Sequence, residues 1–286
     1  NPELAHSKRE QNLESLLIDS TKALAELPPE TATPKLLIWP ESVYPDPFFK
    51  VADSREKVTA FARKYKTYIL LTTVDWVNTN SGPKFHGVSV LVGENGKVLG
   101  RYNKIFLIPF GETIPFSDWF PGIASFLRKN IANMSEFTRG QEYKVFTLSE
   151  NTRLSAPICF DIFTPEVVRG MVRNGSDLVV NLSNLAWFGR TTASDNMVAV
   201  LRWRAIENRV TVVFASNNGE SLIIGVNGKN MSKKLGLFEE GALISTLKLQ
   251  PRFSFYREYA EWVWGGYLLI FLLLGIQAHL RGKIFE

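Results

Sequence analysis

The sequence has little of the residue types that cross-link a chain or bind metals: one cysteine, Cys159, and three histidines in 286 residues. A single cysteine cannot form an internal disulfide, so the fold must be stabilised by a buried apolar core. The sequence also lacks His/Cys clusters and glycine-rich phosphate loops. We therefore expect no metal and no organic cofactor.

Runs of like charge are lacking as well. The net charge of +5 is spread along the chain, and no run of Lys and Arg is long enough to form a basic arm, so we expect no nucleic-acid partner. With 45% hydrophobic and 21% charged residues, the composition is that of a globular chain. The length allows one large domain with an appended segment.

The appended segment is 262–278, WVWGGYLLIFLLLGIQA, which contains no charged residue. A membrane span needs about 20 apolar residues, with about 17 as the lower limit. Aromatic residues Trp262, Trp264 and Tyr267 cluster at its start, and the basic HLRGK follows its end, as is typical of membrane interfaces. The run therefore predicts a transmembrane helix, and a buried core helix is the alternative.

This segment divides the chain into four predicted parts. They are a globular domain at 1–250, a juxtamembrane linker at 251–261, a transmembrane helix at 262–279 and a tail at 280–286. Arg281 and Lys283 favour a cytoplasmic tail and a domain on the outer face of the membrane, although Arg252 and Arg257 on the other flank nearly balance them.

Hydrophobic periodicity within the domain predicts helices that alternate with short buried strands. The predicted helices cover 13–24, 48–64, 164–175 and 194–208. The predicted strands are KLLIW, YILLTTV, RLSAPICF, DLVVNLS, VTVVFA and 242–249. Two hairpins are expected around Asn95-Gly96 and Asn227-Gly228, residue pairs that type I′ turns prefer. The pattern predicts an α/β protein with a mixed sheet.

Cys159 lies between a predicted strand and a predicted helix that begins with Thr164 as N-cap and Pro165 in its first turn. A thiol near a helix N-terminus is a candidate nucleophile, because the helix dipole favours the thiolate. A small buried hydrophobe is the alternative, and position alone does not decide. Of the histidines only His86 is a conceivable base, since His6 and His279 lie near the ends, so the sequence disfavours a Cys/His protease.

Glu41 and Lys104 offer a different chemistry for Cys159. Glu41 follows a buried strand in LLIWPESVYP, and Lys104 ends a hairpin strand in RYNKIFLIPFGETIP. A buried carboxylate can act as a general base, and a lysine can stabilise the negative charge that develops in acyl transfer. The alternative is that both are solvated loop charges.

The motifs WPES, YNK, PFGE and ICFD, each at a strand end, resemble the nitrilase superfamily. LIPFGETIPF, NLSNLAWFGR, RAIENR and SNNGES are similar to the apolipoprotein N-acyltransferase family. The resemblance covers roughly residues 36 to 264 and implies a four-layer αββα sandwich followed by one transmembrane helix. It also implies Cys159 as nucleophile, Glu41 as general base and Lys104 as stabiliser of the oxyanion.

Further positions match the family's site. The resemblance implies supporting roles for the acids Glu112 and Asp161 and for Phe160, which stands where tyrosine is usual. It places three residues near the acyl-binding pocket: Trp187, Phe188 and Gly189. Leu185, Phe106 and Met197 depart from the family pattern, which expects aspartate, histidine and histidine there. These departures concern the shape of the pocket and the donor preference.

The segment IPFSDWFPGIASFLRK carries a group of apolar residues: Trp119, Phe120, Ile123, Phe126 and Leu127. They predict either a lid that dips into the bilayer interface and contacts the substrate, or ordinary core packing.

The implied function is N-acyl transfer at the bacterial inner membrane, with the catalytic domain on the periplasmic face. A phospholipid would donate a fatty acyl group to Cys159 as a thioester, and the N-terminal amine of a diacylglyceryl-cysteine on an apolipoprotein would accept it. The alternatives are a membrane-tethered amidase or an inactive binding module. Family members begin with a bundle of membrane helices and a first core strand, so we expect these to precede Asn1 in the native polypeptide or, for the bundle, to come from another chain.

Overall fold

The computed structural model describes residues 2–28, 34–80, 82–115, 117, 119–120, 122, 126, 136–249 and 252–282. Its strands form two mixed sheets. The first has the order β1 (Leu36–Ile38), β2 (Tyr68–Thr79), β3 (Gly82–Val92), β4 (Val98–Asn103), in which β1 and β2 are parallel and the other neighbours antiparallel. The second has the order β5 (Phe146–Ser149), β6 (Thr152–Ser155), β7 (Leu178–Asn184), β8 (Thr211–Asn217), β9 (Leu222–Ile224). Its three central strands are parallel and its two edge strands antiparallel to them.

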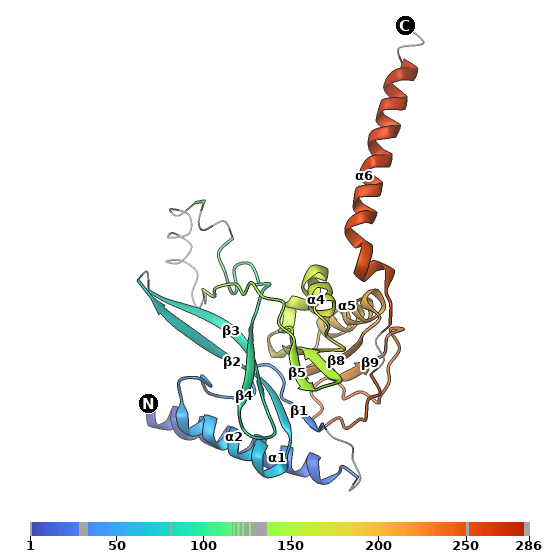
Figure 1. Ribbon diagram of the computed structural model, residues 1–286. Helices are drawn as coiled ribbons and strands as arrows, with labels where there is room; N and C mark the ends of the chain where they lie inside the picture. The colour runs from blue at the N-terminus through green and yellow to red at the C-terminus, as the bar shows by residue number, and fades with distance from the viewer. Residues whose placement is uncertain are drawn as a thin grey trace.

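Helices cover the outer face of each sheet. Figure 1 shows α1 (Pro2–Ala25) and α2 (Ala52–Tyr65) along the first sheet, and α4 (Pro165–Arg173) and α5 (Ala193–Asn208) beside the second. Two short 3₁₀ helices, η1 (Cys159–Phe163) and η2 (Ala186–Phe188), follow β6 and β7. The expected αββα sandwich with mixed sheets is therefore confirmed.

The layers follow from the two-residue period of the strands. In β2, Ile69 and Leu71 belong to the apolar cluster that lies between the first sheet and helices α1 and α2. Leu70, between them in the sequence, belongs to the other cluster, which fills the space between the two sheets and extends to α4 and α5. In β3, Val90 and Leu91 divide in the same way. Successive side chains on a strand point to opposite faces, and apolar residues at every position bury both faces.

The two predicted hairpin turns form, but not as type I′ turns. In each, only the glycine has a positive φ, 76° at Gly96 and 78° at Gly228. Gly93 and Gly225 each begin a turn. The loop is closed by a hydrogen bond from the N–H of this first residue to the carbonyl of the residue that follows the positive-φ glycine: Gly93 N–H donates to Lys97 O, and Gly225 N–H donates to Lys229 O. This is the geometry of a three-residue loop, a type I turn followed by a left-handed glycine, so the prediction of type I′ was wrong.

The predicted strand at 242–249 was also wrong. These residues are irregular, and among the described parts of the chain no strand pairs with them. Leu243, Leu247 and Leu249 are partly buried against the core of the second sheet. The apolar pattern reflects that burial, whereas a strand also requires a hydrogen-bonded neighbour.

The C-terminal helix α6 (Phe255–Gly282) begins before the predicted span at 262 and includes most of the predicted linker at 251–261. Its first turns pack on the domain: Ala260 is buried, Glu261 pairs with Arg169 and Arg173 of α4, and Ser254 Oγ donates to the carbonyl of Glu207. Residues Phe255–His279 are long and apolar enough to cross a membrane, and little of the helix is buried. It projects from the domain (Figure 1).

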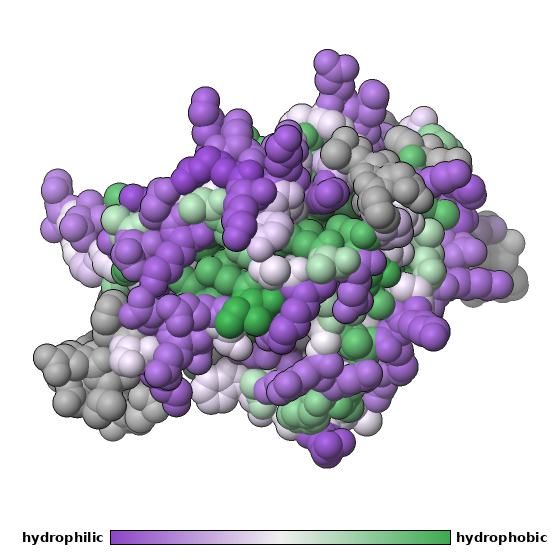
Figure 2. Space-filling model, turned by 90° about the horizontal axis from the view of Figure 1, so that it is seen from below, coloured by the Kyte–Doolittle hydropathy of each residue, from purple (hydrophilic) through white to green (hydrophobic). Residues whose placement is uncertain are grey.

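The opposite side of the domain also exposes apolar residues. On the face that includes α1 and the turn between β3 and β4, hydrophobic residues gather in a hollow surrounded by hydrophilic ones (Figure 2). Apolar surface is therefore not confined to α6.

Candidate active site

The sheets bring Glu41, Lys104 and Cys159 to one end of the sandwich. β1 and β4 run in the same direction, because β4 is antiparallel to β3, which is antiparallel to β2. Glu41 follows β1 and Lys104 directly follows β4, so both lie at the same edge of the first sheet. Cys159 follows β6 and Asn184 ends the parallel β7 in the second sheet. Sites in α/β proteins form at such carboxyl ends of strands.

Cys159 has a left-handed backbone conformation, with φ 48°. A non-glycine residue with this φ is strained and must be held by its surroundings. The Asn181 side chain on β7 donates to the carbonyl of Cys159 at 3.1 Å and to that of Pro157 at 3.2 Å. The Ser183 hydroxyl donates to Asn181 Oδ1 at 2.8 Å, which fixes the orientation of the amide. The turn is thus held from the neighbouring strand.

Asp161 joins this turn to the segment of Lys104. Its buried carboxylate accepts hydrogen bonds from the Tyr102 hydroxyl at 2.7 Å and from the Phe106 peptide N–H at 2.6 Å. It also accepts from the peptide N–H groups of Ile105, 3.2 Å, and Ile158, 3.0 Å. Burial raises the pKa of Asp161, and these donors partly offset the effect. One carboxyl group therefore fixes Lys104 relative to Cys159.

Glu41 is in direct contact with Cys159. The thiol hydrogen-bonds to the Glu41 carboxylate, and Glu41 Oε2 accepts from the Asn184 peptide N–H at 2.8 Å. Removal from water raises the pKa of Glu41, while the charge of Lys104 and the Asn184 hydrogen bond oppose the shift. A carboxylate with a raised pKa is a better proton acceptor than a solvated one.

Lys104 is almost fully buried and pairs with Glu112, with 2.6 Å between Nζ and Oε1. The other oxygen of Glu112 accepts from the Ile108 peptide N–H at 2.9 Å, so the carboxylate is held in place. Burial alone would lower the pKa of Lys104, but the negative charges of Glu41 and Glu112, and the hydrogen bond to Glu112, outweigh it and raise the pKa. The side chain is therefore a fixed cation beside the sulfur.

The Cys159 thiol is protonated at neutral pH, because burial and the neighbouring Glu41 raise its pKa to about 12. The charge of Lys104 and a hydrogen bond from the Asn184 peptide N–H oppose the shift. Burial therefore has a larger effect on the pKa of Cys159 than the predicted stabilisation of the thiolate by a helix N-terminus. The arrangement can form the thiolate only when the proton passes to a base, and Glu41 is the carboxylate in contact with it.

The predicted pocket residues lie around this turn. Phe160 stacks on Phe163 with ring centroids 5.0 Å apart, and its ring lies 6.1 Å from that of Phe188 in η2. Trp187 is 90% exposed, and Gly189 ends η2 with φ 56°. Phe188 is thus brought to the cysteine turn, whereas Trp187 extends into solvent.

The predicted lid segment carries exposed aromatic side chains. Trp119 is 78% exposed, and Phe120 and Phe126 are also exposed, whereas Ile123 and Leu127 lie outside the described residues. Core packing is therefore not the role of the three described residues.

The departures from the family pattern are structurally accommodated. Leu185 and Met197 are buried in the core of the second sheet. Phe106 is half-buried, and only its peptide N–H, a donor to Asp161, is engaged in the site.

Sequence reasoning missed Asn181, Asn184 and Tyr102. Asn181 and Ser183 are buried polar residues on one face of β7, LVVNLSN, in which every residue except the last, Asn184, is buried. A buried polar residue needs a hydrogen-bond partner, so this alternation was a signal for a role in holding another segment. Within the described parts of the chain, no group of three or more His, Cys, Asp or Glu side chains could hold a metal ion.

The carbon-nitrogen hydrolase family matches residues 7–252. Among curated proteins, the chain is 33% identical over 79% of its length to an apolipoprotein N-acyltransferase of Geobacter metallireducens and covers 42% of that protein. It is 29% identical over 94% of its length to apolipoprotein N-acyltransferase 2 of Treponema denticola and covers 51% of it. The chain thus spans about half the length of the curated relatives it matches.

Solved structures show the same fold at lower identity. An amidase from Nesterenkonia sp. AN1 matches with a TM-score of 0.63 and 21% identity, covering 84% of this chain and 88% of the amidase. Nit3 of Saccharomyces cerevisiae, a member of the nitrilase superfamily, matches with a TM-score of 0.62 and 19% identity, covering 81% and 82% of the two chains.

Proposed function

The chain belongs to the carbon-nitrogen hydrolase family, and we propose that it is an acyltransferase that acts on lipid substrates at a membrane. The acyl donor is a phospholipid, and the acceptor is the N-terminal amine of a diacylglyceryl-cysteine on an apolipoprotein. The observation that carries the proposal is the contact of Glu41 with the buried Cys159 thiol beside the fixed cation Lys104. The apolipoprotein N-acyltransferases among the relatives support the choice of reaction.

In the first half-reaction, Glu41 accepts the thiol proton as Cys159 attacks the ester carbonyl of the phospholipid. The negative charge moves to the carbonyl oxygen, where the buried Lys104 ammonium stabilises it in a site of low dielectric. Glu112 keeps the ammonium in place through its ion pair. Glu41 returns the proton to the departing oxygen, and a lysophospholipid leaves behind an acyl-Cys159 thioester.

In the second half-reaction, the neutral α-amine of the lipoprotein attacks the thioester carbonyl. Glu41 accepts a proton from the attacking nitrogen, Lys104 again stabilises the oxyanion, and the sulfur leaves and is reprotonated. The products are an amide and the free thiol. Because Cys159 has a pKa of about 12, its proton must be moved at each step, which makes Glu41 essential to both halves.

The preference for lipid over a small amide rests on exposed apolar surface. Trp119, Phe120 and Phe126 are exposed on the segment after Glu112, and Trp187 is exposed next to the cysteine turn. Aromatic side chains of this kind insert at membrane interfaces, where an acyl chain can pass from bilayer to site. Helix α6 would hold the domain at the bilayer. We assign Trp187, Phe188 and Gly189 to the acyl-binding side of the site.

We further propose that the domain faces the periplasm of a bacterial inner membrane, where lipoproteins receive their third acyl chain. A bundle of membrane helices, from this polypeptide or another chain, would complete the protein in the membrane. Mass measurement of the native protein tests this: a mature mass near 32.3 kDa without a partner would contradict it.

The experiment is to incubate the full chain with vesicles that contain an acyl-labelled phospholipid, then search for a hydroxylamine-sensitive label on Cys159. We expect the label in the wild type, its loss in Cys159→Ala, and its transfer to the amine of a synthetic diacylated lipopeptide. Lys104→Ala should slow labelling by about 100-fold to 1,000-fold, the typical effect of removing one oxyanion donor.

The partly exposed Lys144, just before β5, provides a control lysine away from the site, and Lys144→Ala should label normally. Retained transfer by Cys159→Ala would refute the mechanism. Hydrolysis of small amides without any thioester from phospholipid would identify an amidase, and absence of both activities a binding module.

A further inference from the structure

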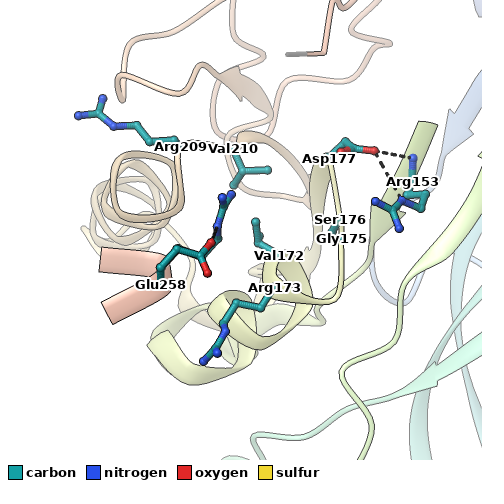
Figure 3. A pocket seen from close by; sticks show the side chains of 10 residues that line it. Arg153, Val172, Arg173, Gly175, Ser176, Asp177, Arg209, Val210 and Glu258 are labelled. Atoms are coloured by element: carbon teal, nitrogen blue, oxygen red, sulfur yellow. Dashed lines mark hydrogen bonds and ion pairs between the residues drawn. The ribbon is translucent and has the colours of Figure 1, made fainter. Parts of the chain in front are cut away.

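A crevice of about 240 Å³ lies where α6 joins the domain, away from Cys159 (Figure 3). It is formed by the starts of β6 and β7, the ends of α4 and α5, and the first turn of α6. Cys159 follows the opposite, carboxyl end of β6, so the crevice and the candidate active site lie at opposite ends of the second sheet. Val172 and Val210 contribute its apolar lining.

The crevice is lined by more positive than negative groups. Its lining includes four arginines, Arg153, Arg173, Arg209 and Arg257, and two carboxylates, Asp177 and Glu258. Figure 3 shows Arg153 beside Asp177, and Arg173 and Arg209 extending outward from the ends of their helices. The excess of guanidinium groups favours an anionic ligand.

Most of these arginines already have a carboxylate partner. Asp177 pairs with Arg153 at 3.9 Å, Glu258 with Arg257 at 2.7 Å, and Glu261 with Arg173 at 3.3 Å. Among the described residues, no ion pair or hydrogen bond engages the Arg209 guanidinium. Arg209 is exposed and follows α5 directly, with φ 51°. It is therefore the group most available to a ligand.

The position of the crevice along α6 indicates what the ligand is. Arg257 and Glu258 lie in the first turn of α6, and the run without charges begins at Trp262, about 6 Å further along the helix axis at about 1.5 Å per residue. If α6 enters a bilayer there, the crevice lies at the depth of the phospholipid headgroups. The ion pairs of Glu261 with Arg169 and Arg173 fix α6 against α4 and so keep this wall in place.

We propose that the phosphate of an anionic phospholipid headgroup binds at the mouth of the crevice, where the outward-extending Arg209 is its main contact, at a site separate from the acyl-donor site. This inference rests on the part of the proposed function that places α6 in a membrane, but not on acyl transfer. The lipid would stabilise the junction of domain and helix by bringing negative charge to the arginines of both.

The test is native mass spectrometry of the full chain in detergent micelles, with added dioleoyl phosphatidylglycerol, dioleoyl phosphatidylcholine or inorganic phosphate. We expect a phosphatidylglycerol adduct that survives collision energies at which the phosphatidylcholine adduct is lost. Arg209→Gln should lower the occupancy of the phosphatidylglycerol adduct by about tenfold, the loss of one charge-assisted contact. Arg63→Gln on α2, in the opposite helix layer, is the matched control and should retain it.

Cys159→Ala should also retain the adduct, and Arg209→Gln should form the Cys159 thioester at the wild-type rate. Equal retention of the two lipids, retention of inorganic phosphate as strong as that of phosphatidylglycerol, or an unchanged adduct in Arg209→Gln would each overturn the proposal. Loss of the adduct in Cys159→Ala would show that the bound lipid is the acyl donor and overturn it as well. A retained adduct without any thioester formation would refute acyl transfer and leave this site standing.

Discussion

At the scale of single residues, the chemistry of the candidate site depends on how burial changes the protonation of three side chains. The Cys159 thiol and the Glu41 carboxyl both have raised pKa values because water is excluded from them. Lys104 keeps its charge in the same environment because the acids Glu41 and Glu112 lie next to it. The resting site therefore holds a neutral thiol beside a proton acceptor and a cation.

This protonation state predicts the pH dependence of thioester formation. Glu41 acts as a base only when deprotonated, so the rate must fall as the pH decreases through its raised pKa, with a midpoint above the ordinary carboxyl value of 4.5. Glu41→Gln should remove the base and lower the rate by at least about 100-fold at every pH.

The rate of label incorporation between pH 4 and pH 9 measures this profile. Glu56→Gln on the exposed face of α2 is the control, and its profile should match the wild type. A midpoint at or below 4.5, or a profile that Glu41→Gln leaves intact, would exclude Glu41 as the base.

Asp161 predicts a different kind of effect, because it positions other groups. Its carboxylate accepts four hydrogen bonds, so Asp161→Asn turns an amide NH₂ toward groups that are themselves donors. We expect the free energy of unfolding to fall by about 1 to 3 kcal/mol. Thioester formation should become slower, but the pH midpoint of its acid-side decrease should not change, because Glu41 sets that midpoint.

Urea unfolding and the same pH profile provide the two readouts, with the exposed Asp53→Asn as control. A shift of the midpoint with unchanged stability would instead give Asp161 a direct part in proton transfer.

At the scale of secondary-structure elements, a hairpin turn of each sheet lies close against a covering helix, and a glycine stands at the point of closest approach. A Cβ on Gly96 would lie 2.9 Å from the Thr59 carbonyl oxygen of α2. A Cβ on Gly228 would lie 2.7 Å from the Ile206 side chain of α5. Both glycines have a positive φ, so the tight turn and the close approach of the helix require the same residue.

Gly96→Ala should therefore lower the free energy of unfolding by about 2 kcal/mol or more, from backbone strain and from the clash with α2. Gly82→Ala is the matched control, because Gly82 also has a positive φ, 108°, but a Cβ there would meet nothing within 4 Å. Chemical unfolding of both variants measures the difference, and equal losses would show that the contact with α2 adds nothing.

At the scale of the whole molecule, α6 connects a folded domain to a long exposed apolar surface. Its first turns pack on α4 and α5, and the residues that follow are exposed over several turns. Contiguous apolar surface of this extent is typical of a segment that meets lipid. The domain would then be held close to the membrane, because the first turns of α6 pack on α4 and α5 and are not a flexible linker.

Arginines in the middle of α6 should therefore prevent membrane insertion. Each arginine at the centre of a span costs about 2.5 to 3.5 kcal/mol on insertion scales, so the double variant Leu269→Arg, Leu272→Arg should no longer float with phospholipid vesicles in a density gradient. The exposed Ile18 on α1 provides the control, and Ile18→Arg should float as the wild type does. Flotation of the double variant would mean that α6 does not hold the chain in the bilayer.

The sequence alone was sufficient for the features that depend on local pattern. The buried strands, the helices around them and the order of Glu41, Lys104 and Cys159 at strand ends could be predicted from periodicity and from motif resemblance. Hydrophobic periodicity and turn residues depend only on residues close together in the sequence, so helices and strands can be predicted from them without knowledge of the fold. The limits appeared where a partner is needed: 242–249 has the apolar pattern of a strand but no neighbour to pair with among the described residues.

Only the tertiary structure decided how the chemical groups act on each other. The raised pKa of Cys159, the ion pair of Lys104 with Glu112 and the hold of Asn181 on the cysteine turn depend on segments far apart in the chain. The same is true of the early start of α6 on the domain and of the arginine crevice beside it. The residue type sets the ordinary pKa of a group. Burial, nearby charges and hydrogen bonds then shift that pKa, and these depend on the packing of the whole molecule.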